Sequence, residues 1–357
     1  MLNFSVGPVL MDEEILEVGS QQIPYFRTHE FSKIMLENEA LLKETTGALS
    51  STSALFLTCS GTGAMEAVVI NCLTQQDKVL VINGGSFGAR FEELCIIHQI
   101  PHEVVNLAYG EPLTQERIKE YEGKCFTALL INKHETSTGV LYDMDVVKNF
   151  CRAENTLLVV DAISTFLADE LSMERDGIDV LIISSQKALA LPPGISIVLL
   201  NEKIKQKISD RHPRMLYFDF NHYLKDGVRG QTPFTPAVSI LLQLNKKLRM
   251  ISRVGIASII AQVKEQAEDF RSKLGNLPLK FFHNHLSNAL TPLQPLGGWS
   301  ATELFNVLKN EYNIFVCPNG GTLKETLFRI GHIGAITKKD NNTLIHALWE
   351  IQKGMKQ

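Results

Sequence analysis

Short apolar runs rich in β-branched residues recur along the first 200 residues of the chain. Five of them lack the alternation of a half-exposed strand, which indicates strands buried on both faces; they cover residues 78–82, 127–131, 156–160, 179–183 and 196–200. Between most of them, apolar residues recur three and four positions apart, at 64–73, 87–98 and 144–154, as in amphipathic helices. This order predicts an α/β domain with a mostly parallel sheet flanked by helices. Such sheets bind their ligands at the carboxyl ends of the strands.

The pattern changes near Pro236 and suggests a second, smaller domain. A long amphipathic stretch runs through Leu274, followed by short apolar segments and a last helix at about 341–355. We expect a large domain over residues 13–240 and a small carboxyl-terminal α+β domain over residues 241–357. Residues 1–12 are too few for a domain and too apolar to be free, so we expect this segment to pack near the active site.

Charge and cysteine usage narrow the class of protein. The 357 residues include 35 Lys and Arg against 39 Asp and Glu, a net charge of −4. This balance offers no cationic surplus for nucleic acid or anionic lipid, and no run reaches the ~18 apolar residues of a membrane span. The six cysteines are scattered without a CxxC pair, which fits reduced thiols in a cytoplasmic protein.

The segment Thr58–Gly63, TCSGTG, follows an apolar run and opens a predicted helix. Small residues let backbone N–H groups approach an anion, and a helix start adds unpaired donors and partial positive charge. The segment therefore suits a phosphate, although a plain tight turn explains it equally simply. It matches neither GxGxxG nor GxxxxGK[ST], so neither a dinucleotide nor a nucleoside triphosphate is indicated.

Two charged residues follow predicted buried strands. Asp161 ends the run 156–160, and Lys187 follows the run 179–183. A buried carboxylate is costly unless a cation or proton donor meets it, so an Asp161–Lys187 ion pair is one explanation. The other is that Lys187 forms a Schiff base with pyridoxal phosphate while Asp161 holds the proton on the pyridinium nitrogen.

Seven motifs give the chain a specific resemblance. In chain order they are SGTGAMEA (60–67), GGSFGAR (84–90), HETSTGVL (134–141), VVDAISTF (159–166), SSQKAL (184–189), QTPFTPA (231–237) and FRIGHIG (328–334). The chain resembles class V, fold-type I pyridoxal phosphate aminotransferases, in the branch of alanine:glyoxylate, serine:pyruvate and 2-aminoethylphosphonate:pyruvate transaminases. The likeness runs from Gly7 to the last helix.

The resemblance implies roles for the cofactor site. Lys187 would carry the cofactor and then shuttle the proton at the substrate Cα, and Asp161 would keep the ring nitrogen protonated. Phe87 stands where relatives usually have Trp or Tyr stacked on the ring, and its phenyl group still offers a stacking face. Thr136 would bond the phenolic oxygen. The implied phosphate ligands are Ser60, Gly61, Thr62 and Gln186.

The resemblance also implies a homodimer and a substrate clamp. Thr232 would reach the phosphate of the neighbouring subunit's cofactor, and Arg229 either adds a charge to that contact or is solvated. Arg329 would clamp the α-carboxylate of the substrate with its planar fork. Gly7 falls in the substrate site, and Arg27 would meet a second acidic group or a dimer contact.

These roles predict an aminotransferase that moves an amino group from a small donor such as alanine or serine to a small 2-oxo acid, pyruvate or glyoxylate. Two other activities stay open: 2-aminoethylphosphonate:pyruvate transamination, which needs further cations such as Arg27, Arg90 or Arg229, and cysteine desulfuration with Cys317 as the reactive thiol. A third possibility is a non-catalytic scaffold or binding protein that keeps this fold but has lost its enzymatic activity. His283 and His285 resemble a metal pair, but without a third ligand we expect no metal.

Overall fold

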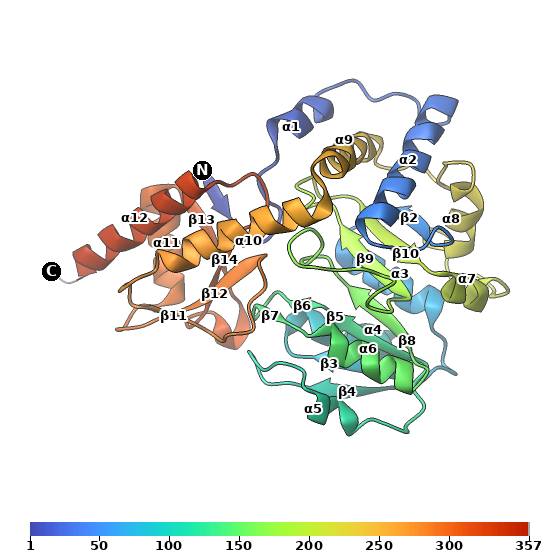
Figure 1. Cartoon of the computed structure of the whole chain (residues 1–357), viewed down its shortest axis with the longest axis horizontal. Coiled ribbons are helices and arrows are strands. Elements are labelled where there is room, and N and C mark those ends of the chain that lie inside the picture. Colours follow the sequence, from blue (N-terminus) through green and yellow to red (C-terminus); the bar gives the residue numbers. More distant parts are fainter. Residues whose placement is uncertain (356–357) are drawn as a thin grey trace.

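The computed structural model describes residues 1–355 and places a seven-stranded sheet at the centre of the large domain (Figure 1). The spatial order is β2 (Ser53–Leu57), β10 (Ser196–Leu200), β9 (Val180–Ser184), β8 (Leu157–Asp161), β5 (Ala128–Asn132), β3 (Val79–Asn83) and β4 (His102–Asn106). Only β10 runs antiparallel to its neighbours β2 and β9, and the other pairs in the sheet are parallel. The predicted α/β fold is confirmed, and all five predicted strands form.

Helices cover both faces of this sheet and create two cores. Successive residues of one strand alternate between them: Leu80 and Ile82 pack in one core, Val79 and Val81 in the other. This explains why the runs show no polar alternation. The first core receives helices α1 (Glu13–Gly19), α2 (His29–Thr45), α5 (Gln115–Lys119), α6 (Met144–Ala153) and α9 (Val238–Val254); the second receives α3 (Gly61–Cys72), α4 (Ser86–Ile97), α7 (Glu202–Ile208) and α8 (Phe220–Gly227).

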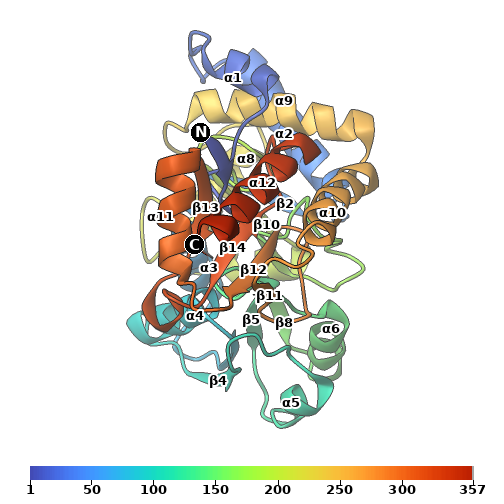
Figure 2. The ribbon, with the colours of Figure 1, turned by 90° about the vertical axis from the view of Figure 1, so that its left-hand side faces the viewer.

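A second sheet of five strands forms the small domain. Its order is β1 (Leu2–Phe4), β13 (Ile314–Pro318), β14 (Phe328–Gly331), β12 (Leu290–Pro295) and β11 (Leu279–Phe281). It packs with α10 (Ile256–Ser272), α11 (Ala301–Tyr312) and α12 (Lys338–Met355) in a core of its own (Figure 2). Two short elements complete the chain, the ribbon of β6 (His134–Glu135) with β7 (Val140–Leu141) and the 3-10 turn Gly321–Leu323.

The amphipathic stretch after Pro236 forms two helices, separated at Gly255, whose φ is +87°. Helix α9 packs its Leu241, Leu244 and Leu248 into the core of the large domain, whereas Phe270 of α10 lies in the core of the small domain. The division at residues 240 and 241 stays a proposal, and this packing favours Gly255 as its position. None of the helices within residues 1–355 has the length and apolarity needed to cross a membrane.

Candidate active site

The start of α3 provides the predicted anion site. Ser60 is its N-cap residue, and the Ser60 side chain accepts from the Gly63 N–H at 3.4 Å. The N–H groups of Gly61 and Thr62 belong to the first turn and have no acceptor within the helix. A Cβ at Gly61 would lie 2.4 Å from Cδ1 of Ile163, so a larger residue there would have to displace the end of that side chain. Ser60 and Thr62 are exposed, which leaves their donors open to a ligand.

Lys187 lies three residues beyond the carboxyl end of β9. This is the same edge of the sheet as the start of α3. Burial lowers the pKa of Lys187 to about 8, and the positive charges of Arg329 and Arg90 act in the same direction. Within residues 1–355 its amine makes no hydrogen bond or ion pair, and it is therefore free to react. The amino-terminal segment closes over it, because a Cβ at Gly7 would lie 2.6 Å from Lys187 Cδ.

Asp161 ends β8, the strand beside β9. Its Oδ1 accepts from the Ile163 N–H at 2.8 Å. Burial raises the pKa of Asp161 to about 6, and the negative charge of Glu135 adds to this effect. Among the ion pairs of residues 1–355 there is none between Asp161 and Lys187, so the simple ion-pair explanation of these two residues is wrong. A buried carboxylate without a cation is suited to receive a protonated ring nitrogen.

The HETSTG segment forms the wall next to Asp161. The Thr136 hydroxyl donates to Ser164 Oγ at 2.9 Å, and His134 Nδ1 contacts the same Ser164 oxygen at 2.9 Å. Burial lowers the pKa of His134 to about 3, so this imidazole is neutral. The Ser164 contacts were not predicted, although Ser164 belongs to the VVDAISTF motif, because nothing in the spacing of the two segments reveals that they meet.

Phe87 and Gln186 lie on neighbouring parts of the same edge. Phe87 is the second residue of α4, and the Arg90 guanidinium stands 4.9 Å from the centre of its ring. Arg90 also donates to the Thr62 hydroxyl at 3.1 Å and so connects α4 to the anion site. Gln186 Oε1 accepts from Ser184 Oγ at 2.6 Å, which leaves the Gln186 Nε2 hydrogens available as donors.

Arg329 enters the site from β14 of the small domain and is buried. One guanidinium nitrogen donates to the Thr136 carbonyl at 2.8 Å and another to the Pro318 carbonyl at 2.6 Å. Its Nε has no partner in the described part of the chain. Two backbone carbonyls on different domains thus fix the position of the charge, and the Nε–H and the second hydrogen of each terminal nitrogen stay available.

Comparison with known proteins identifies the family of this chain. The model of the family "Aminotransferase class-V" matches residues 21–321. The chain belongs to the class V aminotransferase family. This aminotransferase is 31% identical to a Synechococcus protein named "Soluble hydrogenase, small subunit", over 96% of this chain and 90% of that one. It is 29% identical to the alanine–glyoxylate aminotransferase of Rattus norvegicus, over 94% of this chain and 83% of that one.

The aminotransferase has the same fold as a protein whose crystal structure has been solved. A crystal structure of an alanine–glyoxylate aminotransferase from Nostoc sp. superimposes with a TM-score of 0.93 over 98% of this chain and 95% of that chain, at 24% identity. The family's cofactor is pyridoxal 5′-phosphate. The residues present fit that group: open donors at the start of α3, a glycine where a Cβ would collide with Ile163, and an unpaired lysine amine.

The remaining predicted residues of the aminotransferase have other partners. Arg27 donates to Gln231 Oε1 at 3.0 Å and to the carbonyls of Thr232 at 2.7 Å and Pro233 at 3.1 Å. The Thr232 hydroxyl donates to the Phe234 carbonyl at 2.7 Å. Arg229 is exposed and pairs with Asp226 at 2.7 Å. These residues form a second cluster, and no hydrogen bond within residues 1–355 joins it to Ser60, Gly61 or Thr62.

Cys317 and the two histidines differ from what their sequence positions suggested. Cys317 lies in β13, in register with Arg329, and not in a late loop as expected. His283 Nε2 contacts the Thr138 carbonyl at 2.9 Å, and its Nδ1 accepts from the His285 N–H at 3.1 Å. Both nitrogens of His283 are thus already engaged. In residues 1–355 no three His, Cys, Asp or Glu side chains gather as metal ligands.

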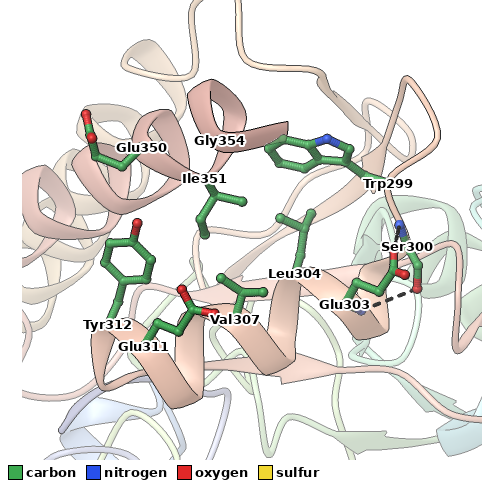
Figure 3. Close-up of a pocket in the computed structure, with 10 residues that line it drawn as sticks. All are labelled: Trp299, Ser300, Glu303, Leu304, Val307, Glu311, Tyr312, Glu350, Ile351 and Gly354. Carbon is green, nitrogen blue, oxygen red and sulfur yellow. Dashed lines mark hydrogen bonds between the residues drawn. The ribbon is translucent and has the colours of Figure 1, made fainter. Parts of the chain in front are cut away.

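A separate cavity of about 430 Å³ opens between α11 and α12 in the small domain (Figure 3). Trp299 and Tyr312 stand at its two ends, and Leu304 and Val307 of α11 face Ile351 of α12 across it. None of the predicted site residues lines it. We therefore place the chemistry at the edge of the large sheet and not in this cavity.

Proposed function

We propose that this aminotransferase moves an amino group from a small amino acid of the alanine or serine type to a small 2-oxo acid, pyruvate or glyoxylate. Arg329 carries this proposal, because its buried guanidinium is held in position by two carbonyls and its charge acts on the pKa of Lys187. A planar guanidinium matches a carboxylate with two parallel hydrogen bonds. The names of the rat and Nostoc relatives, both alanine–glyoxylate aminotransferases, support the same substrate class.

Pyridoxal phosphate, when bound, supplies the carbonyl that receives the amino group and the ring that withdraws electrons from the substrate Cα. We propose that Ser60, Gly61, Thr62 and Gln186 hold its phosphate, that Phe87 stacks on its ring and that Thr136 bonds its phenolic oxygen. The Thr136 hydroxyl donates to Ser164, so its oxygen can still accept a hydrogen bond.

Lys187 is the group that would move the proton at the substrate Cα. A lysine must be neutral to accept a proton, and burial with neighbouring arginines lowers the pKa of Lys187 to about 8. About one lysine in ten is then neutral at pH 7, against fewer than one in a thousand for an ordinary lysine. Asp161 would hold the proton on the ring nitrogen, since its buried carboxylate gains a cationic partner there.

We propose a homodimer in which Thr232 serves the neighbouring site. Within residues 1–355 the Thr232 cluster makes no hydrogen bond to Ser60, Gly61 or Thr62, and exposed apolar side chains flank its segments: Tyr25 is 69% exposed and Val228 84%. Their segments are joined, because Gln231 donates to Ser32 Oγ of α2 at 2.7 Å. Apolar side chains exposed together mark an interface. Arg27 would then hold the Thr232 loop in place for the partner, and Gly7 would border the substrate.

We propose the cytoplasm as the location of this aminotransferase, in keeping with its six unpaired cysteines.

A donor panel with purified holoenzyme tests the substrate class. Alanine, serine, aspartate and 2-aminoethylphosphonate are each offered with pyruvate or glyoxylate, and the amino product is quantified. We expect alanine and serine to be used. Turnover of 2-aminoethylphosphonate alone would overturn the proposal. Two of the cations which that donor requires are already engaged, Arg27 by the 231–233 segment and Arg229 by Asp226. Desulfuration would show instead as sulfide released from cysteine, and its loss in Cys317→Ser.

A further inference from the structure

Helix α4, which carries Phe87, begins without a side-chain cap of its own. Its N-cap residue is Gly85, which has no side chain to accept a hydrogen bond. The Glu135 carboxylate from β6 takes this place: its Oε2 accepts from the Gly88 N–H at 2.9 Å and from the Phe87 N–H at 3.2 Å. The Ser86 N–H donates to Ser137 Oγ at 3.1 Å. A segment almost 50 residues further along the chain therefore caps the first turn of α4.

The site is built around this carboxylate. Glu135 is completely buried. Its other partners are Asn132 Nδ2 at 3.0 Å, the Ser137 N–H at 3.1 Å and the Ser137 hydroxyl at 2.5 Å. A Cβ at Gly85 would lie 2.4 Å from Ser137 Oγ and 2.6 Å from Glu135 Cδ, so Gly85 is glycine because the carboxylate comes this close.

Two proposed cofactor contacts meet at Glu135. Phe87 gives it a backbone N–H, and Thr136 is the next residue in the chain. A charged acceptor binds N–H donors more strongly than a neutral one, and a negative charge at a helix start is favourable. The carboxylate thus connects the residue expected on the ring face to the residue expected at the phenolic oxygen.

We propose that Glu135 is a positioning residue, which fixes Phe87 relative to Thr136 so that the cofactor ring meets both in one geometry. This rests on the proposed roles of Phe87 and Thr136 at the cofactor, and it does not depend on which amino donor the enzyme uses. Glu135 acts through Phe87 and touches neither substrate nor cofactor.

The test is Glu135→Gln, an isosteric change that removes the charge. The matched control is Asp179→Asn, because Asp179 is also buried and its carboxylate accepts from the Leu158 N–H at 2.8 Å and from Asn201 at 2.6 Å. Asp179 precedes β9, at the opposite edge of the sheet from Lys187. Each apoprotein is titrated with pyridoxal phosphate by calorimetry, and the circular dichroism of the bound cofactor is recorded.

We expect Glu135→Gln to weaken cofactor binding about fivefold or more and to change the dichroic band, since losing a helix cap has effects of this size. Asp179→Asn should lower the melting temperature of the apoprotein yet keep wild-type affinity. Equal affinity of wild type and Glu135→Gln would overturn the inference. Should Glu135→Gln fail to fold, Ser137→Ala, which removes a hydroxyl donor to the carboxylate, should give a smaller change in the same direction.

A double-mutant cycle with Phe87→Leu separates positioning from general stability. If Glu135 acts through the ring, Glu135→Gln should change affinity less than twofold in the Phe87→Leu background. The same loss in both backgrounds would contradict this route. Wild-type protein that binds the cofactor but uses no amino donor would refute the proposed function and leave this inference intact.

Discussion

Gly7 lies directly beside the Lys187 side chain, although Gly7 follows β1 of the small-domain sheet and Lys187 follows β9 of the large sheet. A Cβ at Gly7 would stand 2.6 Å from Lys187 Cδ and 2.9 Å from the Gln186 carbonyl, and Gly7 has a φ of +126°. The amino-terminal segment therefore forms part of the wall around the reactive amine. The segment was expected near the site from its apolar residues alone.

Gly7→Ala should damage the site more than the fold. Any side chain at residue 7 must displace Lys187 or the backbone of Gln186, and its left-handed φ adds strain. We expect at least about a tenfold loss of kcat with a modest change in melting temperature. Gly354→Ala, where nothing lies within 4 Å of the added Cβ, is the matched control. Wild-type kcat in Gly7→Ala would contradict the contact.

Lys187→Ala should abolish both half-reactions while leaving the large domain folded, because the variant lacks the amine that would carry the cofactor. The measurement is single-turnover amino transfer together with borohydride reduction and mass spectrometry of the intact chain. Wild type should gain the reduced cofactor at Lys187, and the variant should gain none. A stable adduct in the variant would refute the assignment.

Arg329→Lys should raise KM for alanine and for pyruvate much more than it changes cofactor affinity. Lysine keeps the charge but loses the planar fork, and it cannot satisfy both the Thr136 and Pro318 carbonyls. We expect kcat/KM to fall about 30-fold or more. Calorimetric titration with pyridoxal phosphate is the control readout. A large loss of cofactor affinity with unchanged KM would place Arg329 in the cofactor site instead.

Asp161 should make the apoprotein less stable as the pH rises from about 4 to 6. Its pKa is raised by burial to about 6 in the folded chain, so the folded state binds more protons than the unfolded state in this window. Stability from this group is present at low pH and is lost as the carboxyl ionises. Asp161→Asn should remove this loss of stability, which amounts to roughly 1–3 kcal/mol. Urea unfolding of the wild-type and Asp161→Asn apoproteins at pH 4.5 and 7 measures this loss. If the free energy of unfolding changes equally with pH in both proteins, the raised pKa of Asp161 is disproved.

Subunit mixing tests whether Thr232 acts on the partner's site. Lys187→Ala and Thr232→Asp are each expected to be inactive, the second because a carboxylate would repel the phosphate. In a mixed dimer, one site combines the intact Lys187 of one chain with the intact Thr232 of the other. Activity should return on mixing under conditions that exchange subunits. No recovery, with dimers shown by mass measurement, would place Thr232 in its own chain's site.

The residues that sequence alone predicts here are those at the ends of elements. Asp161 and Lys187 follow apolar strands and Ser60 precedes a helix, so local pattern fixes their position at one edge of the sheet. Long-range partners leave no such pattern. The capping of α4 by Glu135, the Ser164 contact of Thr136, and the binding of Arg27 to the 231–233 segment each join residues 28 or more positions apart.

Helix boundaries show the same division between local and distant causes. The amphipathic spacing after Pro236 was correct, but the break at Gly255 assigns α9 to one core and α10 to the other, and an apolar stripe does not say which core it faces. The edge strand β4 was missed because its side chains are half-exposed and its sequence, HEVVN, carries polar residues at both ends.

The pairing of β1 with β13 has a consequence for how the protein is made. Leu2 is in register with Ile314, so β1 finds its neighbour only after the large domain and the chain as far as β13 have been synthesised. The leading residues must remain unpaired while the larger sheet assembles behind them. A bulky group attached directly ahead of β1 would therefore burden that late docking step.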